Sequence, residues 1–242
     1  PILPGWVWKE PVLVGANLAI IGMGIVMIGP NMYLAVFAQS VTGVKAIAAG
    51  FILASMSITW PLSSSRAGSL YLRFGFRNTA LLGILFVILG SVGFLFVPYP
   101  GPVWMLVGTQ LLLGAGFGLI STPLLVGVQS TVSYHDRGVV TGTNMFCRYF
   151  GQSIGAALLA VIFNWLIQHI MESAPLHILE ALPHVNNIVD AMQSAALNSE
   201  VAVFLQQAFF EATQGVYLAM TVVGVLTLFV LVKTPARFGK IR

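Results

Sequence analysis

Charged residues are what this sequence most lacks. Only 7% of its 242 residues are Asp, Glu, Lys or Arg, whereas ordinary soluble domains carry about a quarter. Hydrophobic residues make up 57% of the chain, and a soluble fold of this size has no way to cover that much apolar surface. Lipid must therefore be the solvent for most of the chain, and we expect an all-α integral membrane protein.

Cysteine, metal-binding spacings and catalytic pairs are also scarce. The single cysteine, Cys147, lies in an apolar run and excludes an internal disulfide. Three histidines, His169, His177 and His184, cluster in one polar stretch, but their spacing matches no metal site, and we interpret them as solvated loop residues. No nucleophile is paired with a base inside an apolar run, which argues against an intramembrane enzyme. We expect neither a cofactor nor a metal.

Long apolar runs are what the sequence has instead. A bilayer core needs about 20 mostly apolar residues per helix, and six segments satisfy that need. Helices are favoured over strands because the runs are long and show no alternation of polar and apolar residues. The expected spans are residues 12–37, 46–62, 79–97, 103–128, 139–167 and 209–232. Residues 168–208 form a polar outer stretch, for which we expect one or two short interfacial helices.

The few basic residues predict how these spans are oriented. The side that holds both termini carries Lys9, Arg66, Arg73, Arg77, Arg137, Lys233, Arg237, Lys240 and Arg242. The opposite side has Lys45 alone. Because cytoplasmic loops retain Lys and Arg, we expect both termini to be cytoplasmic, in an inner or plasma membrane. The charges flank the spans without forming a continuous stripe, so no nucleic-acid partner is expected.

Polar residues follow one face of four spans. In the fifth span Asn144, Arg148 and Gln152 recur at steps of four residues, and similar stripes run along the first, second and fourth spans. Polar side chains in membrane helices usually face a bundle interior or a water-filled cavity. The third and sixth spans have almost none and are expected to face lipid. The residues expected to line a substrate pathway are Asn31, Tyr33, Gln110, Thr122, Asn144, Arg148 and Gln152.

Simpler explanations stay open for several of these positions. Gly114 and Gly118, like Gly151 and Gly155, have the spacing that lets membrane helices pack closely without touching a substrate. The amide side chains have a similar alternative, which is bonding from one helix to another. Arg148 either extends to the cytoplasmic interface or supplies a fixed positive charge to the cavity.

A short basic loop after the second span carries a recognisable pattern. It runs from Gly68 to Arg77, and in the major facilitator superfamily the corresponding loop reads approximately G-x-L-A-D-R-x-G-x-R. Gly68, Leu70, Arg73, Gly75 and Arg77 match that pattern, whereas Leu72 occupies the position of the family's Asp. The resemblance implies gating and orientation roles for Gly68, Arg73, Gly75 and Arg77, and a weakened cytoplasmic clamp at Leu72.

Two further runs extend the resemblance over nearly the whole chain. Residues 113–118 are glycine-rich and precede Pro123, and residues 138–155 are similar to the family's G-x-x-x-G…R-x-x-G-x-S-I-G run. In order and spacing these runs resemble the carboxyl-terminal half of a fourteen-helix drug:proton antiporter of the QacA/EmrB-like type. The resemblance implies multidrug efflux, in which lipophilic or cationic small molecules leave in exchange for protons by alternating access.

Two features bear on whether the chain acts alone. Apart from Glu211 near the outer end of the sixth span, no acidic residue lies at membrane depth, so we expect the proton-coupling group in a missing amino-terminal half. The start at Pro1 also favours a fragment, in which residues 1–242 form one six-helix bundle. The alternative is a stand-alone six-span protein that acts as a dimer or an interaction partner.

Overall fold

All regular secondary structure in the described residues is helical. The computed structural model describes residues 5–174, 199–236 and 238–239. Its long helices are α1 (Pro11–Gly29), α3 (Ala46–Phe74), α4 (Phe76–Leu95), α5 (Val103–Ser130), α6 (Arg137–Glu172) and α9 (Ser199–Lys233), with η2 (Pro30–Leu34) and α2 (Ala35–Ser40) continuing α1. By length and composition, six helical segments of this part of the chain are able to cross a membrane, as the sequence predicts.

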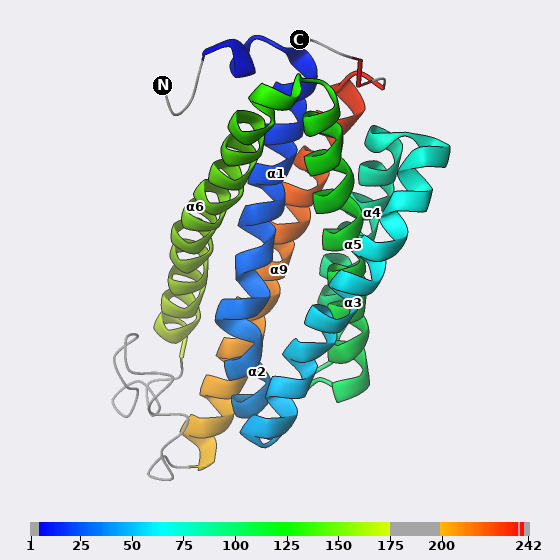
Figure 1. Cartoon of the computed structure of the whole chain (residues 1–242). Helices are drawn as coiled ribbons and strands as arrows, with labels where there is room; N and C mark the ends of the chain where they lie inside the picture. The colour runs from blue at the N-terminus through cyan, green and yellow to red at the C-terminus, as the bar shows by residue number, and fades with distance from the viewer. Residues whose placement is uncertain (1–4, 175–198, 237, 240–242) are drawn as a thin grey trace.

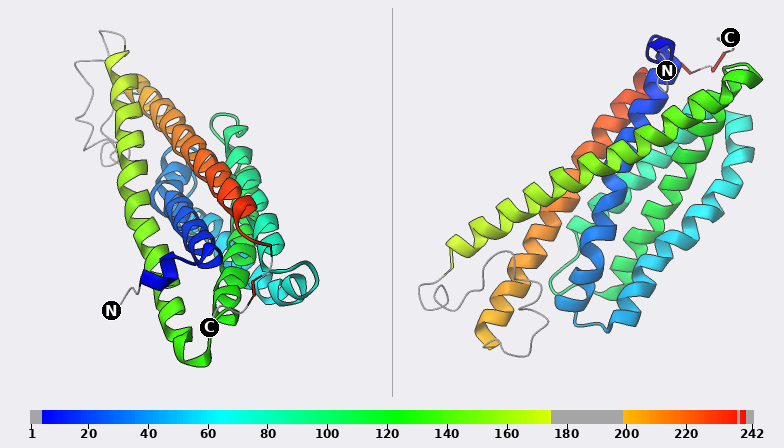
Figure 2. Two further views of the ribbon diagram at one scale, coloured as in Figure 1. Left: turned by 90° about the horizontal axis from the view of Figure 1, so that it is seen from above. Right: turned by 60° about the vertical axis from the view of Figure 1, so that its left-hand side comes forward.

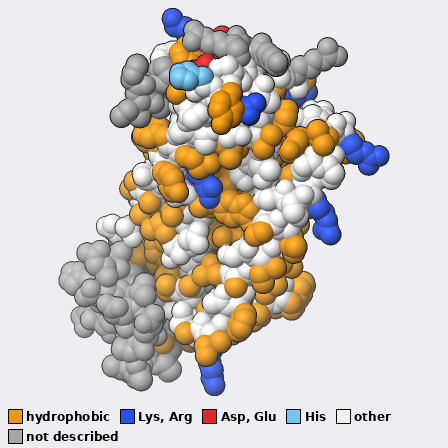
Figure 3. Space-filling view, viewed as in Figure 1, with side chains coloured by type: hydrophobic (Ala, Val, Ile, Leu, Met, Phe, Trp, Pro, Cys, Tyr) orange, Lys and Arg blue, Asp and Glu red, His pale blue; other side chains and the backbone are white. Residues whose placement is uncertain are grey.

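The helices run up and down in alternation, so that both termini lie at one end of the bundle (Figure 1). The most extensive packing joins α5 to α4 and α3, and α1 to α6, while α9 packs against α4, α1 and α6. Seen from the side, α6 runs obliquely past α1 and α9 (Figure 2). Lys and Arg side chains gather mainly at the end that holds the termini, and apolar side chains cover the flanks (Figure 3).

The first span changes its helical form at Pro30. Proline has no N–H to donate and its ring collides with the preceding turn, so the α-helix cannot continue unchanged. The chain forms one π-helical turn, η2, before α2 resumes the α-helix. The side-chain amide of Asn31 donates to the carbonyl oxygen of Met27 at 2.8 Å, which satisfies a backbone acceptor beside this turn.

Three helices extend beyond the expected spans. From the expected span at residues 46–62, α3 continues to Phe74, and the hydroxyls of Ser63, Ser65 and Ser69 donate to carbonyls three residues earlier. The basic loop is therefore helical except at Gly75. Similarly, α6 and α9 both extend into residues 168–208. The short interfacial helices expected in this stretch fall on residues 175–198, which lie outside the described residues. Falling hydropathy marks where a helix leaves lipid, not where it ends.

The third and sixth spans are less peripheral than their composition suggests. Among the membrane-length helices, α4 and α9 are more buried than α3 and α6. The rings of Phe94 on α4 and Tyr217 on α9 are both buried and stack with their centroids 3.8 Å apart. Each helix nevertheless leaves one apolar face exposed, as at Leu89 and Val222. A lack of polar residues does not distinguish a buried helix face from a lipid-facing one. The burial of α4 and α9 could therefore not be predicted from their composition.

Glycines mark the places where helix backbones touch. A methyl group on Gly116 of α5 would lie 2.6 Å from the carbonyl oxygen of Gly83 on α4, and one on Gly155 of α6 would lie 2.7 Å from Ile25 of α1. Real Cβ atoms do not approach other atoms so closely. Packing is therefore the role that the structure supports for these small residues, Gly151 included, whose added Cβ would meet the backbone of Ile21.

We predict that Gly116→Val lowers the free energy of unfolding by about 1–3 kcal/mol, because overpacking would force α4 away from α5. Gly108→Val is the matched control in the same helix, since nothing lies within 4 Å of an added Cβ there. That control should change stability by less than about 0.5 kcal/mol. Unfolding of the full-length protein in mixed micelles measures both, and equal losses would contradict the packing argument.

Candidate functional site

A cavity of about 200 Å³ lies where α1, α3, α5 and α6 meet. No lining residue comes from α4 or α9, in agreement with the expectation that the first, second, fourth and fifth spans share a polar volume. The lining residues are Ile20, Trp60, Ser64, Ser121, Thr122, Leu125, Val126, Asn144, Met145 and Arg148. Apolar walls thus surround a few polar groups, which is the composition of small-molecule sites.

Arg148 turns into the bundle. Its guanidinium carbon lies 4.9 Å from the ring centroid of Trp60, a cation–π contact between α6 and α3. Its Nη2 donates to the thioether sulfur of Met27 on α1 at 3.7 Å, and its Nε is buried with no hydrogen-bond partner among the described residues. Of the two alternatives left open by the sequence, this geometry fits a fixed charge in the cavity and not a side chain that extends to the interface.

Gln152 and Asn144 extend the polar stripe of α6 on either side of Arg148. The amide of Gln152 also donates to the sulfur of Met27, at 3.8 Å, so two donors share one weak acceptor. The buried amide of Asn144 donates to the side-chain oxygen of Asn17 on α1 at 3.3 Å. Thr122 lines the cavity from α5, with Asn144 and Arg148 from α6, whereas Gln152 is not among the lining residues. Sequence spacing predicted that these α6 residues share one face, and the structure directs that face at α1 and α3.

Three other expected pathway residues lie elsewhere. Gln110 is fully buried and donates to the hydroxyl of Tyr217 at 3.3 Å, which joins α5 to α9. Tyr33 is buried against Phe163 of α6, with ring centroids 4.7 Å apart. Asn31 is exposed and bonded to its own helix. Their part in a pathway stays a prediction, and in this chain they are not among the residues that line the cavity.

Sequence reasoning missed Trp60 and Met27, which hold the guanidinium in place. Both are apolar residues in apolar runs, and a search for polar stripes passes over them. The one available signal is their spacing: Trp60 lies four residues before Ser64, and Met27 lies seven after Ile20, so each shares a helix face with a lining residue.

Comparison with known proteins identifies the family. A sequence model described as "Major Facilitator Superfamily" matches residues 2–156, more than half of the chain. The chain belongs to the Major Facilitator Superfamily.

Several bacterial members of the superfamily are similar to most of the chain. "Multidrug transporter protein MdtP" of Bacillus subtilis is 24% identical over 209 residues, which are 86% of this chain and 39% of that protein. "Multidrug resistance protein 3" of Bacillus subtilis is 26% identical over 67% of the chain and 32% of its own length. "Uncharacterized MFS-type transporter Rv1877" of Mycobacterium tuberculosis is 26% identical over 97% of the chain and 34% of its own length. The chain thus spans well under half the length of these relatives.

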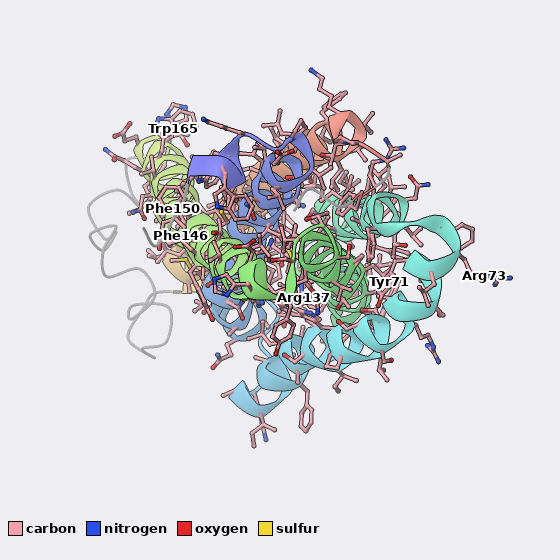
Figure 4. All side chains as sticks on the ribbon, turned by 45° about the horizontal axis from the view of Figure 1, so that its top comes forward. Tyr71, Arg73, Arg137, Phe146, Phe150 and Trp165 are labelled. Carbon is pink, nitrogen blue, oxygen red and sulfur yellow. The ribbon has the colours of Figure 1, made fainter. Side chains whose placement is uncertain are left out.

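The segment that resembles the superfamily's gating loop forms the junction between α3 and α4. Gly68 lies inside α3, and Gly75 interrupts the helices with a φ of 85°, a conformation that residues with a side chain rarely adopt. Arg73 points away from the bundle and is exposed (Figure 4). Leu72, at the family's acidic position, is 81% exposed.

Arg77 is anchored at the end of another helix. Its Nη1 donates to the carbonyl oxygen of Thr234, just past the last residue of α9, at 3.1 Å. A cation near the final carbonyls of a helix is favourable, because they carry the negative end of the helix dipole. Beside it, the ring of Phe76 stacks between Tyr71 and Phe238, with centroids 4.9 and 5.4 Å away. The tail after α9 therefore packs on the α3–α4 junction.

We predict that Arg77→Ala lowers the free energy of unfolding by about 1 kcal/mol or more, because it removes a charged hydrogen-bond donor from the end of α9. Arg73→Ala is the control, since that side chain is exposed and has no hydrogen bond within the described residues. Unfolding titrations of the two full-length variants in mixed micelles make the comparison. A loss at Arg73 equal to that at Arg77 would show that the contact with Thr234 contributes nothing.

Proposed function

We propose that this chain forms one six-helix bundle of a longer secondary transporter, which exports lipophilic small molecules by alternating access. The observation that carries the proposal is the cavity between α1, α3, α5 and α6, where apolar walls surround Thr122, Asn144 and Arg148. Membership of the superfamily and relatives named as multidrug transporters support a drug-like cargo. The sequence also suggested cationic cargo, but the one charged group at the cavity is a cation.

The exposed faces of α3 and α6 support a second bundle. These two helices flank the cavity and are the least buried of the six membrane-length helices. On α3, Phe51 is 73% exposed and Ile58 is 60% exposed, while on α6 Tyr149 is 63% exposed. Phe146, Phe150 and Trp165 lie along the same helix as Tyr149 (Figure 4). We infer that sequence beyond residues 1–242 packs on these faces and closes the cavity on its open side.

A spin label placed on these faces tests the second bundle. With Cys147 replaced by Ser, we predict that a nitroxide at Ile58 or Tyr149 of the full-length protein is poorly accessible to oxygen, because protein covers it. A nitroxide at Val222, which is 53% exposed on α9, should be freely accessible to oxygen dissolved in lipid. Equal accessibility at all three sites would mean that α3 and α6 face lipid. If an isolated six-span chain protects Ile58 only as a dimer, the stand-alone alternative holds.

We also propose that export is driven by proton exchange and that the coupling carboxylate lies outside this chain. Among the described acidic residues, Glu211 comes nearest to membrane depth, but it is exposed and accepts a hydrogen bond from Gln207 at 3.2 Å.

The orientation that we propose for the chain in the membrane is based on its charges. Basic residues gather at the end with both termini, which we place on the cytoplasmic side of an inner or plasma membrane.

Transport in vesicles tests the exporter directly. In inverted vesicles that hold the full-length protein, we predict uptake of radiolabelled chloramphenicol, an uncharged lipophilic compound, that a proton ionophore abolishes. Asn144→Ala and Arg148→Ala should each lower the initial rate about fivefold, the equivalent of one hydrogen bond of about 1 kcal/mol. Ser153→Ala, on the exposed side of α6, should leave the rate unchanged. Unchanged transport in both cavity variants would refute the pathway assignment.

A further inference from the structure

We propose that the cavity binds anionic groups, with Arg148 as their anchor, so that organic anions with a small aromatic or apolar body are among the molecules transported. This inference rests on the proposed function, since it names the substrate class of the same site. It reverses the charge that the family resemblance implies for the cargo. Three features of Arg148 and its surroundings carry it.

The first feature is the unsatisfied hydrogen-bonding capacity of Arg148. A guanidinium has five N–H donors, and buried charged donors normally find acceptors. Among the described residues, the buried Nε of Arg148 has no hydrogen-bond partner, and Nη2 donates to a thioether sulfur at 3.7 Å. The planar fork of donors matches a carboxylate or phosphate better than any other ligand group. The side chain is therefore short of the acceptors that an anion would bring.

The second feature is that a second donor converges on the same place. The amide nitrogen of Gln152 lies 3.8 Å from the sulfur of Met27, and the same sulfur accepts a hydrogen bond from Arg148. A thioether is a weak acceptor, and two strong donors aimed at one such atom leave most of their hydrogen-bond energy unused. An anionic oxygen beside Met27 would accept from both donors at once.

The third feature is the sign of the charge. No carboxylate is among the residues that line the cavity. Of the acidic residues that the structure describes, Glu10, Asp136, Glu172 and Glu200 lie near the ends of helices. Glu211 lies about three turns into α9, where it is exposed and accepts a hydrogen bond from Gln207. An arginine cation at membrane depth normally pairs with an acid or with a ligand. A cationic cargo would meet repulsion here in a low-dielectric setting, whereas an anion would neutralise the site.

The walls define the body that accompanies the anionic group. The indole of Trp60 lies under the guanidinium, and Ile20, Leu125 and Val126 add apolar surface. The volume of about 200 Å³ is enough for one ring, since an apolar cavity of about 150 Å³ holds benzene. An aromatic acid such as benzoate has the required charge, acceptor geometry and size.

Binding of radiolabelled benzoate to the purified full-length protein tests this. We expect saturable binding that Arg148→Gln weakens at least tenfold, about the effect of losing charged hydrogen bonds, and that Arg148→Lys keeps in part. Benzamide, the uncharged isostere, should compete poorly in the wild type and as well as benzoate in Arg148→Gln. Arg137→Gln is the matched control, because it removes an exposed arginine from the end of the same helix.

Met27→Leu supplies a variant that keeps Arg148. Replacing the thioether removes the weak acceptor without removing either donor, so Met27→Leu should still bind benzoate much more tightly than benzamide. A tenfold loss of benzoate binding in Met27→Leu would show that the sulfur, not an anion, completes the site. Lipophilic tetraphenylphosphonium, added as a cationic competitor, should not displace benzoate.

Several outcomes would overturn the inference. Absence of saturable benzoate binding would mean that a carboxylate from sequence beyond this chain already neutralises Arg148. Equal affinity in wild type and Arg148→Gln would mean that the anion binds elsewhere. Transport of chloramphenicol without benzoate binding would refute the anion site and leave the exporter, whereas benzoate binding without any transport would do the reverse.

Discussion

Close approach of helix backbones is the constraint on which the rest of this structure depends. In lipid there is no hydrophobic force between helices, so association relies on packing and on interhelical hydrogen bonds. Gly24, Gly151 and Gly155 bring α1 and α6 into backbone contact, and Gly83 and Gly116 do the same for α4 and α5. Asn144 reaches Asn17, and Arg148 reaches Met27, only because α1 lies that close to α6.

The close approach of α1 and α6 also explains how a positive charge is held inside the bundle. Arg148 lies about three turns into α6 and is half-buried, and a charge within a membrane-spanning helix is costly. The π face of Trp60 and the polarisable sulfur of Met27 reduce this cost without neutralising the charge. The site is thus stable enough to form and still incomplete. A carboxylate within the chain would have stabilised the arginine further and removed its ability to bind a ligand.

Much of this arrangement could be predicted from the sequence, because hydropathy and helical periodicity are local properties. The number of membrane-length helices and the common face of Asn144, Arg148 and Gln152 both follow from spacing along one segment. The contacts that a side chain makes with another helix are not local properties. Nothing in the sequence indicates that Gln110 bonds to Tyr217 or that Arg77 caps α9, since each contact joins residues more than 100 positions apart. Helix ends beyond the membrane were also missed, because a helix outside lipid needs no apolar residues.

The charge of Arg148 also limits how transport could be coupled to protons. A guanidinium has five N–H donors and no acceptor, so this side chain supplies a fixed charge to the cavity. Among the described residues no carboxylate lines the cavity beside Arg148, and under our proposal a bound anion would neutralise the site. The loaded site would then carry less charge than the empty one when access switches from one side of the membrane to the other. Proton exchange would have to occur at a separate titratable group, and cargo binding would affect that group by cancelling the field of Arg148.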